Sequence, residues 1–210
     1  MDYILIPARR GSKGFPFKNR SLVVPLIEKV LSYGFDCNII LSTNDEHIIE
    51  ACKHFPIIIR ERPEQHADDV ATMKSVLLDV IEHCSLEHEK TILTLYPTYP
   101  ERTKQEIEGF FNFYKNNSLS SALCKKSVAT HPYMCLKENG IFHETLIDHE
   151  LYRRQDYPAC FELSHYLCLH RVKEVEKINN QLYNSSTGFF PVEEKIDVDY
   201  EKDYKKWKNK

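Results

Sequence analysis

The first nineteen residues, MDYILIPARRGSKGFPFKN, constrain the fold more than any other stretch of the chain. The apolar run from Tyr3 to Ile6 predicts a buried strand, and Pro7 removes the amide donor that a central strand would need to continue. The loop that follows combines two glycines with four cations, namely Gly11, Gly14, Arg9, Arg10, Lys13 and Lys18. Glycines let backbone N–H groups approach anionic oxygens, and the cations offset their charge, so this loop is suited to a triphosphate.

The alternative is that this basic loop is only a solvated surface turn. Its position directly after a buried strand favours binding, because ligands of open α/β sheets collect at the carboxyl ends of strands. The spacing of the glycines fits neither GxGxxG nor GxxxxGK[ST]. The Rossmann dinucleotide and P-loop interpretations therefore have no support.

Length and charge limit the class of protein. With 210 residues we expect one domain, 1–210, carrying a small insertion. A formal net charge of −3 and the lack of a long cationic run disfavour nucleic acid as a partner. The seven cysteines have no CxxC spacing, so we expect free thiols in a reducing cytoplasm rather than disulfides or a zinc site. No apolar run approaches the roughly 18 residues of a membrane span, and we expect no membrane association.

Strand and helix patterns alternate along most of the chain. Apolar runs predict strands at 3–6, 38–41, 57–59, 91–95, 120–125 and 166–169. Amphipathic spacing and capping residues predict helices at 25–35, from Thr43 onward, at 73–81, 103–116, 173–183 and 200–208. This order predicts an α/β fold with three layers, in which helices cover both faces of a mainly parallel sheet.

The alternation breaks at Lys126. Asn139 and Gly140 stand between apolar residues, which is the strongest short signal for a β-hairpin. We expect a hairpin within 131–143, inside an excursion that spans 126–160. A projecting hairpin of this size is marginal unless something covers it, so the sequence predicts a homodimer.

The run IPARRGSKGFPFKN resembles the signature of the CMP-sugar synthetases, the cytidylyltransferases that activate sialic acid and related nine-carbon sugar acids. Their pattern is approximately IPARxGSKGxPxKN. Further similar segments follow in the family's order: STNDEHII, RPEQHADDVAT, LYPTYPERT, RRQDYP and KIDVD. The resemblance implies a Rossmann-like nucleotidyltransferase fold, and an excursion that packs on a second subunit and completes its sugar site. The related Kdo-loading enzymes diverge after the first arginine and are the nearest alternative.

The resemblance also implies which residues hold CTP. The triphosphate would be bound by Arg9, Ser12, Lys13 and Lys18, of which Arg9 and Lys18 also act in catalysis, and Lys18 would neutralise charge at the α-phosphate. The nucleoside would be bound by Asn19, Arg62, Asp69 and Thr72. Arg62 suits the cytosine carbonyl oxygen because a guanidinium only donates hydrogen bonds. For Asp69 and Thr72 the alternative is helix capping.

The sugar-binding residues implied by the resemblance lie in two segments, and they are Tyr96, Thr98, Arg102, Arg153, Arg154 and Gln155. Adjacent arginines suit a sugar carboxylate, because Arg can donate two parallel hydrogen bonds to it. A surface ion pair is the alternative for these arginines. The chain departs from the family at two places: Tyr96 replaces a glutamine, and Ser164-His165 replaces an Asn-Gly pair. His165 either replaces a polar contact or fills space.

Asp197 and Asp199 are the predicted metal ligands. Alternate positions of a strand point to the same face, so these carboxylates could converge on one hard cation, Mg²⁺ or alternatively Mn²⁺. The competing interpretation is that both are exposed residues at the start of the last helix.

The resulting expectation is attack of a sugar's anomeric hydroxyl on the α-phosphorus of CTP, with pyrophosphate leaving. The sugar is a sialic, legionaminic or pseudaminic type of nonulosonic acid. Two alternatives stay open: a Kdo-type or other sugar nucleotidyltransferase, and a nucleotide-binding relative that has lost catalysis, which Tyr96 and Ser164-His165 motivate.

Overall fold

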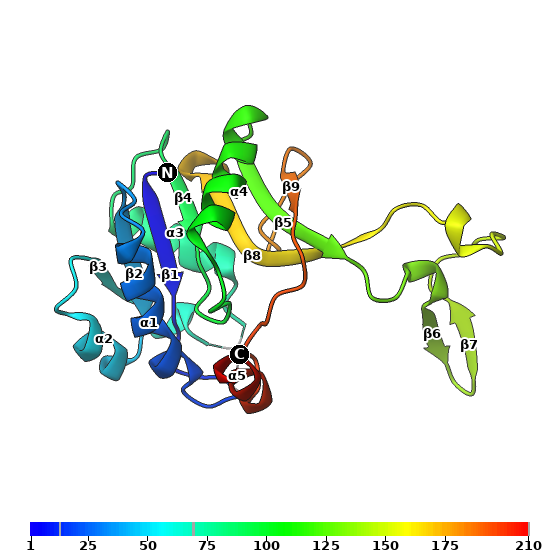
Figure 1. Cartoon of the computed structure of the whole chain (residues 1–210), viewed down its shortest axis with the longest axis horizontal. Helices are drawn as coiled ribbons and strands as arrows, with labels where there is room; N and C mark the ends of the chain where they lie inside the picture. The colour runs from blue at the N-terminus through cyan, green and yellow to red at the C-terminus, as the bar shows by residue number, and fades with distance from the viewer. Residues whose placement is uncertain (13, 69, 210) are drawn as a thin grey trace.

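A seven-stranded sheet runs through the body of the protein (Figure 1). The structure is a computed structural model that describes residues 1–12, 14–68 and 70–209. The sheet order is β3-β2-β1-β4-β8-β5-β9. The strands are β1 (Tyr3–Pro7), β2 (Asn38–Thr43), β3 (Ile58–Glu61), β4 (Thr91–Thr94), β5 (Ser121–Ser127), β8 (Phe161–Arg171) and β9 (Gly188–Pro191). Of these, β8 runs antiparallel to its neighbours β4 and β5, and the other pairings are parallel. The mainly parallel sheet is confirmed.

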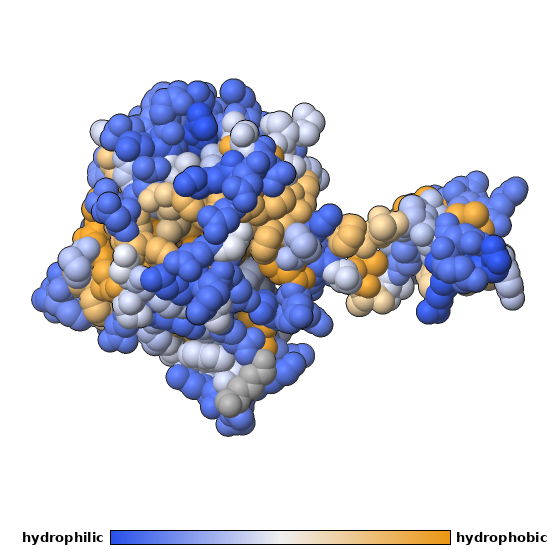
Figure 2. Space-filling view, turned by 45° about the horizontal axis from the view of Figure 1, so that its top comes forward, coloured by the Kyte–Doolittle hydropathy of each residue, from blue (hydrophilic) through white to orange (hydrophobic). Residues whose placement is uncertain are grey.

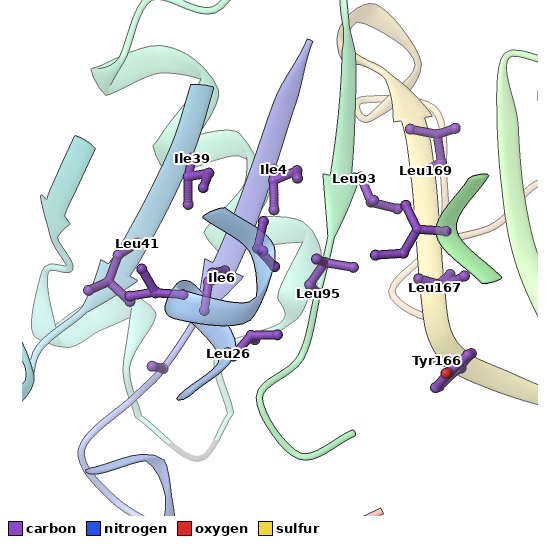
Figure 3. Close-up of a cluster of buried hydrophobic side chains, with 14 of the residues drawn as sticks. Ile4, Ile6, Leu26, Ile39, Leu41, Leu93, Leu95, Tyr166, Leu167 and Leu169 are labelled. Atoms are coloured by element: carbon purple, nitrogen blue, oxygen red, sulfur yellow. The ribbon is translucent and has the colours of Figure 1, made fainter. Parts of the chain in front are cut away.

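Helices cover both faces of this sheet. They are α1 (Lys18–Ser32), α2 (Glu46–Cys52), α3 (Met73–His83) and α4 (Lys104–Asn116). The last helix, α5 (Glu201–Lys208), has no buried residue and lies beside the basic loop, where the ring of Tyr204 contacts that of Phe15. Alternation along β1 sends Ile4 and Ile6 into one buried cluster and Leu5 into another. The first cluster packs the sheet against α1, α2 and α4, as Figure 3 shows around Leu26, and the second packs it against α3. The three-layer α/β/α architecture follows from these two cores.

Several local predictions were wrong. Helix α1 begins at Lys18, not at Pro25, which lies inside it. Asp45 caps α2, accepting a hydrogen bond from His47 N, whereas the predicted capping residue Thr43 donates to Ala8 O. The capping box of Thr103 and Glu106 on α4 is confirmed.

The predicted helix at 173–183 is also absent. In the described structure, this segment has a 3₁₀ turn at Val172–Glu174 in place of the helix. Asn179 Oδ1 accepts hydrogen bonds from the backbone N–H groups of Gln181 and Tyr183. Such side-chain bonds to nearby backbone compete with helix formation. The segment instead forms an irregular cover whose Val175, Ile178 and Leu182 enter the core under α3.

Residues 128–160 leave the body between β5 and β8 and form a projecting arm (Figure 1). The arm contains the hairpin β6 (Leu136–Asn139) and β7 (Phe142–Thr145), with short 3₁₀ turns at Pro132–Met134 and Arg154–Asp156. Gly140 has a φ of 62°, which the tight turn requires, and the predicted hairpin is confirmed. Figure 2 shows the arm standing clear of the body, with apolar residues at its root.

The thiols and the helix lengths bear on two further expectations. All seven cysteines have free thiols. No helix of the described residues is long and apolar enough to cross a membrane.

Candidate functional site

Three adjoining pockets lie along the carboxyl ends of β1 and β4. A loop pocket of about 290 Å³ is lined by Arg9, Gly11, Ser12, Gly14, Lys18, Asn19, Asp199 and Tyr200. A central pocket of about 280 Å³ shares Arg9, Lys18 and Asn19 with it and extends to Arg62, Met73, Tyr96 and Thr98. An outer pocket of about 280 Å³ shares Met73, Tyr96 and Thr98 and extends to Tyr99, His165, Asn180, Leu182 and Asp197. Because each pocket shares lining residues with the next, the three form one continuous site.

The loop pocket is closed on one side by the segment that precedes α5. Lys18 Nζ donates to Asp199 Oδ1 at 2.7 Å and to Val198 O at 2.9 Å. Gly14 packs so closely on this segment that an added Cβ would lie 2.6 Å from Asp199 O. Glycine at this position is therefore required by close approach of two backbone segments.

Asn19 holds the basic loop in place. Its side chain is buried, and Nδ2 donates to Arg9 O at 2.9 Å. Arg9 in turn donates from Nη1 to Asp68 O at 3.1 Å. Asn19 thus lines the loop and central pockets and also fixes the loop that carries Arg9 and Ser12.

Arg62 forms a buried wall of the central pocket. Its side chain donates from Nε to Ser42 Oγ at 3.0 Å and from Nη2 to Ser42 O at 2.8 Å. Burial lowers the pKa of Arg62 to about 10, so the group stays charged at neutral pH. Its Nη1 has no hydrogen-bond partner among the described residues and is the nitrogen left to bind a ligand.

Two other predicted nucleoside residues have a different outcome. Thr72 caps α3, its hydroxyl accepting from Ser75 N at 3.1 Å, which is the structural alternative named for it. Its neighbours Ala71 and Met73 line the central pocket instead. Asp69, like Lys13 in the basic loop, lies outside the described residues, and both assignments stay predictions.

Arg102 is buried in the body and lines none of the three pockets described above. It is 1% exposed, and it donates from Nε and Nη2 to Tyr166 O at 3.2 and 2.9 Å. Nη2 also lies 3.3 Å from Tyr96 O. The guanidinium lies over the rings of Tyr166 and Tyr99, at 5.1 and 5.8 Å from their centroids. This interior placement lets Arg102 hold the two carbonyls in position, and its assignment to the sugar site stays a prediction.

The outer pocket is lined by aromatic side chains and by a carboxylate oxygen that has no hydrogen-bond partner in the described residues. Asp197 Oδ1 is buried without a hydrogen-bond partner among the described residues. The pKa of Tyr99 is raised, first by burial and then by the nearby Asp197 carboxylate. Burial likewise raises the pKa of Tyr96, which lines both the central and outer pockets. Both phenols therefore stay neutral and can donate hydrogen bonds to a ligand.

The two predicted metal ligands do not alternate on a strand. Residues 192–199 have no strand structure, so the geometric premise of that prediction was wrong. Asp197 lines the outer pocket and Asp199 lines the loop pocket. No group of three or more His, Cys, Asp or Glu side chains in the described ranges is arranged to hold a metal ion.

The predicted sugar residues on the arm line none of these three pockets, and the arm that carries them projects from the body (Figure 1). Arg153, Arg154 and Gln155 are exposed around the 3₁₀ turn at Arg154–Asp156. Arg153 Nε donates to Asp156 Oδ2 at 2.8 Å, the surface ion pair that was the alternative interpretation. Within one chain, the loop, central and outer pockets are continuous, and the side chains of Arg153, Arg154 and Gln155 line none of them.

Sequence reasoning missed several lining residues, and these are His66, Met73, Pro97, Tyr99, Asn180 and Leu182. Tyr99 belongs to the LYPTYPERT segment and could have been included with Tyr96 and Thr98. Asn180 gave no usable signal, because its segment was predicted to be helical.

Comparison with known proteins identifies a family and several relatives. A family model described as cytidylyltransferase matches residues 3–209. The N-acylneuraminate cytidylyltransferase of Streptococcus agalactiae serotype III is 28% identical over an alignment of 162 residues, and the match covers 72% of this chain and 39% of that protein. The pseudaminic acid cytidylyltransferase of Campylobacter jejuni serotype O:2 is 32% identical over an alignment of 124 residues, and the match covers 54% of this chain and 53% of that protein. The chain thus spans less than two thirds of the length of either relative.

Among solved structures, that of CMP:2-keto-3-deoxy-manno-octonic acid synthetase complexed with CTP superposes with a TM-score of 0.69. The alignment covers 100% of this chain and 98% of that one, at 15% identity. At so low an identity the likeness supports the fold alone.

Proposed function

Because this chain belongs to the cytidylyltransferase family, we propose that it transfers the cytidylyl group of CTP to a nonulosonic acid and releases pyrophosphate. The observation that carries the proposal is the continuous site, in which a cationic loop pocket, a central pocket and a polar outer pocket follow one another. This order suits the triphosphate, the nucleoside and the sugar. The names of the two relatives, which specify N-acylneuraminate and pseudaminic acid, support this class of sugar.

The chemistry asks the protein mainly for positioning and charge stabilisation. Arg9, Ser12 and Lys18 hold the triphosphate in the loop pocket. Lys18 neutralises charge that develops at the α-phosphate, after its ammonium exchanges the Asp199 carboxylate for phosphate oxygens. Arg62 presents Nη1 to the cytosine carbonyl oxygen, and Met73 and Val76 line the same central pocket.

The site also suits a magnesium ion, with Mn²⁺ as an alternative. The unpaired, buried Asp197 Oδ1 is a hard anionic oxygen of the kind that such ions bind. Asp197 and Asp199 would hold the ion, with the remaining ligands coming from phosphate oxygens and water, as is usual for Mg²⁺ in nucleotide sites. When bound, it supplies charge neutralisation and lowers the pKa of the attacking hydroxyl.

We further propose that the protein works as a homodimer. Within the described residues, the outer pocket is lined by no lysine or arginine that could bind a sugar carboxylate. Arg153, Arg154 and Gln155 stand exposed on the arm, and apolar side chains there, such as Ile141 at 89% and Phe142 at 71% exposure, lack cover. An arm that docks on a partner would cover these residues and bring the arginines to the partner's outer pocket. The free thiols suit a cytoplasmic location.

Pyrophosphate release tests the proposed reaction. The protein is incubated with Mg²⁺ and CTP, ATP or GTP, together with N-acetylneuraminic, legionaminic, pseudaminic or 2-keto-3-deoxy-manno-octonic acid. We expect release with CTP and at least one of the first three acids. Release only with the octonic acid would favour the Kdo-type alternative. CTP binding without release for any acid would favour a relative that has lost catalysis, the candidate that Tyr96 in the central pocket keeps open.

A further inference from the structure

Strand β8 carries a bulge at the edge of the outer pocket. The pairing of β5 with β8 runs from Ser121 and His170 to Leu123 and Cys168. The next residue of β5, Cys124, pairs with Ser164, so residues 165–167 of β8 have no partner on β5. Bulges of this kind occur next to functional sites, where they redirect a side chain. Here the first bulged residue is His165, and its side chain lines the outer pocket.

Arg102 fixes this bulge against the loop that follows β4. Its guanidinium reaches the backbone carbonyls of Tyr166, in the bulge, and of Tyr96, in the loop. The rings of Tyr96 and His165 come to a centroid distance of 6.1 Å, with their planes at 54°. The two rings therefore form one wall of the outer pocket, whose geometry is set by a buried residue.

The hydrogen bond of His165 defines what its ring can offer a ligand. Nε2 lies 3.1 Å from Gln181 O. A carbonyl oxygen can only accept, so Nε2 carries the proton and, in the neutral ring, Nδ1 is an acceptor. In the part of the chain that the structure describes, Nδ1 has no hydrogen-bond partner. The pocket thus presents an imidazole acceptor in addition to the Asp197 carboxylate.

We propose that His165 determines sugar specificity by accepting, at Nδ1, a hydrogen bond from a donor on the sugar. The donor is a hydroxyl or an acylamino N–H group. This inference rests on the proposed function, because it takes the outer pocket as the sugar subsite. A pocket built to pair with a polar group rejects ligands that lack it, since the acceptor is then buried unpaired.

Three substitutions separate recognition from a merely structural role. His165→Asn keeps an oxygen acceptor near the position of Nδ1 but loses the bond to Gln181. His165→Gln keeps an amide donor for Gln181 but loses the acceptor near Nδ1. His165→Ala loses both, and His83→Ala, an exposed residue at the end of α3, is the control for histidine replacement.

The measurement is calorimetric binding of N-acetylneuraminic, pseudaminic and 2-keto-3-deoxy-manno-octonic acids to the CTP-loaded protein without Mg²⁺, so that no turnover is needed. For the acid that binds most tightly, we expect Kd to rise on the order of 10-fold in the Ala and Gln variants and to stay near the wild-type value in the Asn variant. CTP affinity should not change. If the sugar group that donates to Nδ1 is an acylamino N–H, the octonic acid, which has no such group, should bind equally to all variants. Equal losses for both kinds of acid would identify a hydroxyl.

Rescue by Gln rather than Asn would overturn the inference, because it would show that only the bond to Gln181 matters. Unchanged sugar binding in all three variants would overturn it too, as would a wild-type protein that binds none of the acids. Pyrophosphate release is measured separately. Sugar binding without release would remove the proposed catalysis and leave this inference in place.

Discussion

The contacts that stabilise the pockets differ in kind from those that stabilise the arm. In the pockets, side chains bind partners far away in the sequence: Lys18 reaches Val198, 180 positions along, and Arg102 reaches Tyr166, 64 positions along. In the arm, the contacts join residues of the arm to one another, such as Arg153 with Asp156 and the stacked rings of Tyr133 and His149, whose centroids are 4.3 Å apart. The body therefore specifies its own geometry, whereas the arm leaves its outer surface to be covered by something else.

The largest effect that we expect is the loss of turnover when the carboxylates of Asp197 and Asp199 are neutralised. Asp197→Asn and Asp199→Asn each remove a negative charge but keep the shape of the side chain. If these residues hold Mg²⁺ beside the triphosphate, turnover should fall on the order of 10² to 10³-fold. Pyrophosphate release across a Mg²⁺ titration measures this loss.

Thermal melts provide the control for these two variants. Asp199 is exposed and Asp197 Oδ1 is unpaired, so neither substitution should lower the melting temperature much. Wild-type turnover in both variants would contradict the metal assignment.

Removing the arm tests whether the body is self-sufficient. Ser127 pairs with Phe161 across β5 and β8, so an Asn-Gly turn can replace residues 128–160 and close the two strands as a hairpin. We expect a folded monomer of normal CTP affinity whose kcat/KM for the sugar falls on the order of 10²-fold, because the sugar carboxylate loses the arginines that the partner's arm would bring to it. Light scattering should give twice 24.7 kDa for the full chain. A full chain that is monomeric would contradict a shared sugar site.

Two arginines with the same predicted role should behave differently. Arg102→Met leaves the Tyr166 carbonyl buried without its donor and should lower the free energy of unfolding by about 3 kcal/mol. Arg153→Met breaks only an exposed ion pair, which is worth about 0–1 kcal/mol, and should reduce sugar affinity instead. Urea denaturation of both variants measures the difference. Equal stability losses would refute the separation of body from arm.

The smallest effect that we expect concerns the glycines of the basic loop. Gly14→Ala places a Cβ 2.6 Å from the Asp199 carbonyl oxygen, so the basic loop and the segment before α5 must move apart and the loop pocket that both of them line changes shape. We expect KM for CTP to rise about 10-fold, the loss typical of one charged hydrogen bond. Gly11→Ala is the matched control, because nothing lies within 4 Å of its added Cβ. Similar KM values for both variants would show that the close approach is irrelevant to CTP.

The sequence predicted the parts of the fold that depend on local pattern. The first strand and its basic loop, the capping box at Thr103 and the hairpin at Gly140 all depend on residues within a few positions of each other. Prediction from the sequence failed where contacts between residues far apart in the chain determine the position of a side chain. The burial of Arg102 depends on β8, and the separate pockets of Asp197 and Asp199 depend on how the final segment crosses the loop. His165 entered the site through a bulge that no spacing rule indicates.

Complementation between two defective chains tests the central claim most directly. One chain carries Asp199→Asn in the body and an intact arm, and the other carries an intact body with Arg153→Ala and Arg154→Ala in the arm. Each is purified alone, and the two are co-expressed with different tags so that mixed dimers can be isolated. If the arm of one subunit serves the site of the other, a mixed dimer has one intact site and should recover about half of the wild-type pyrophosphate release. Mixed dimers no more active than the two parent variants would contradict the account.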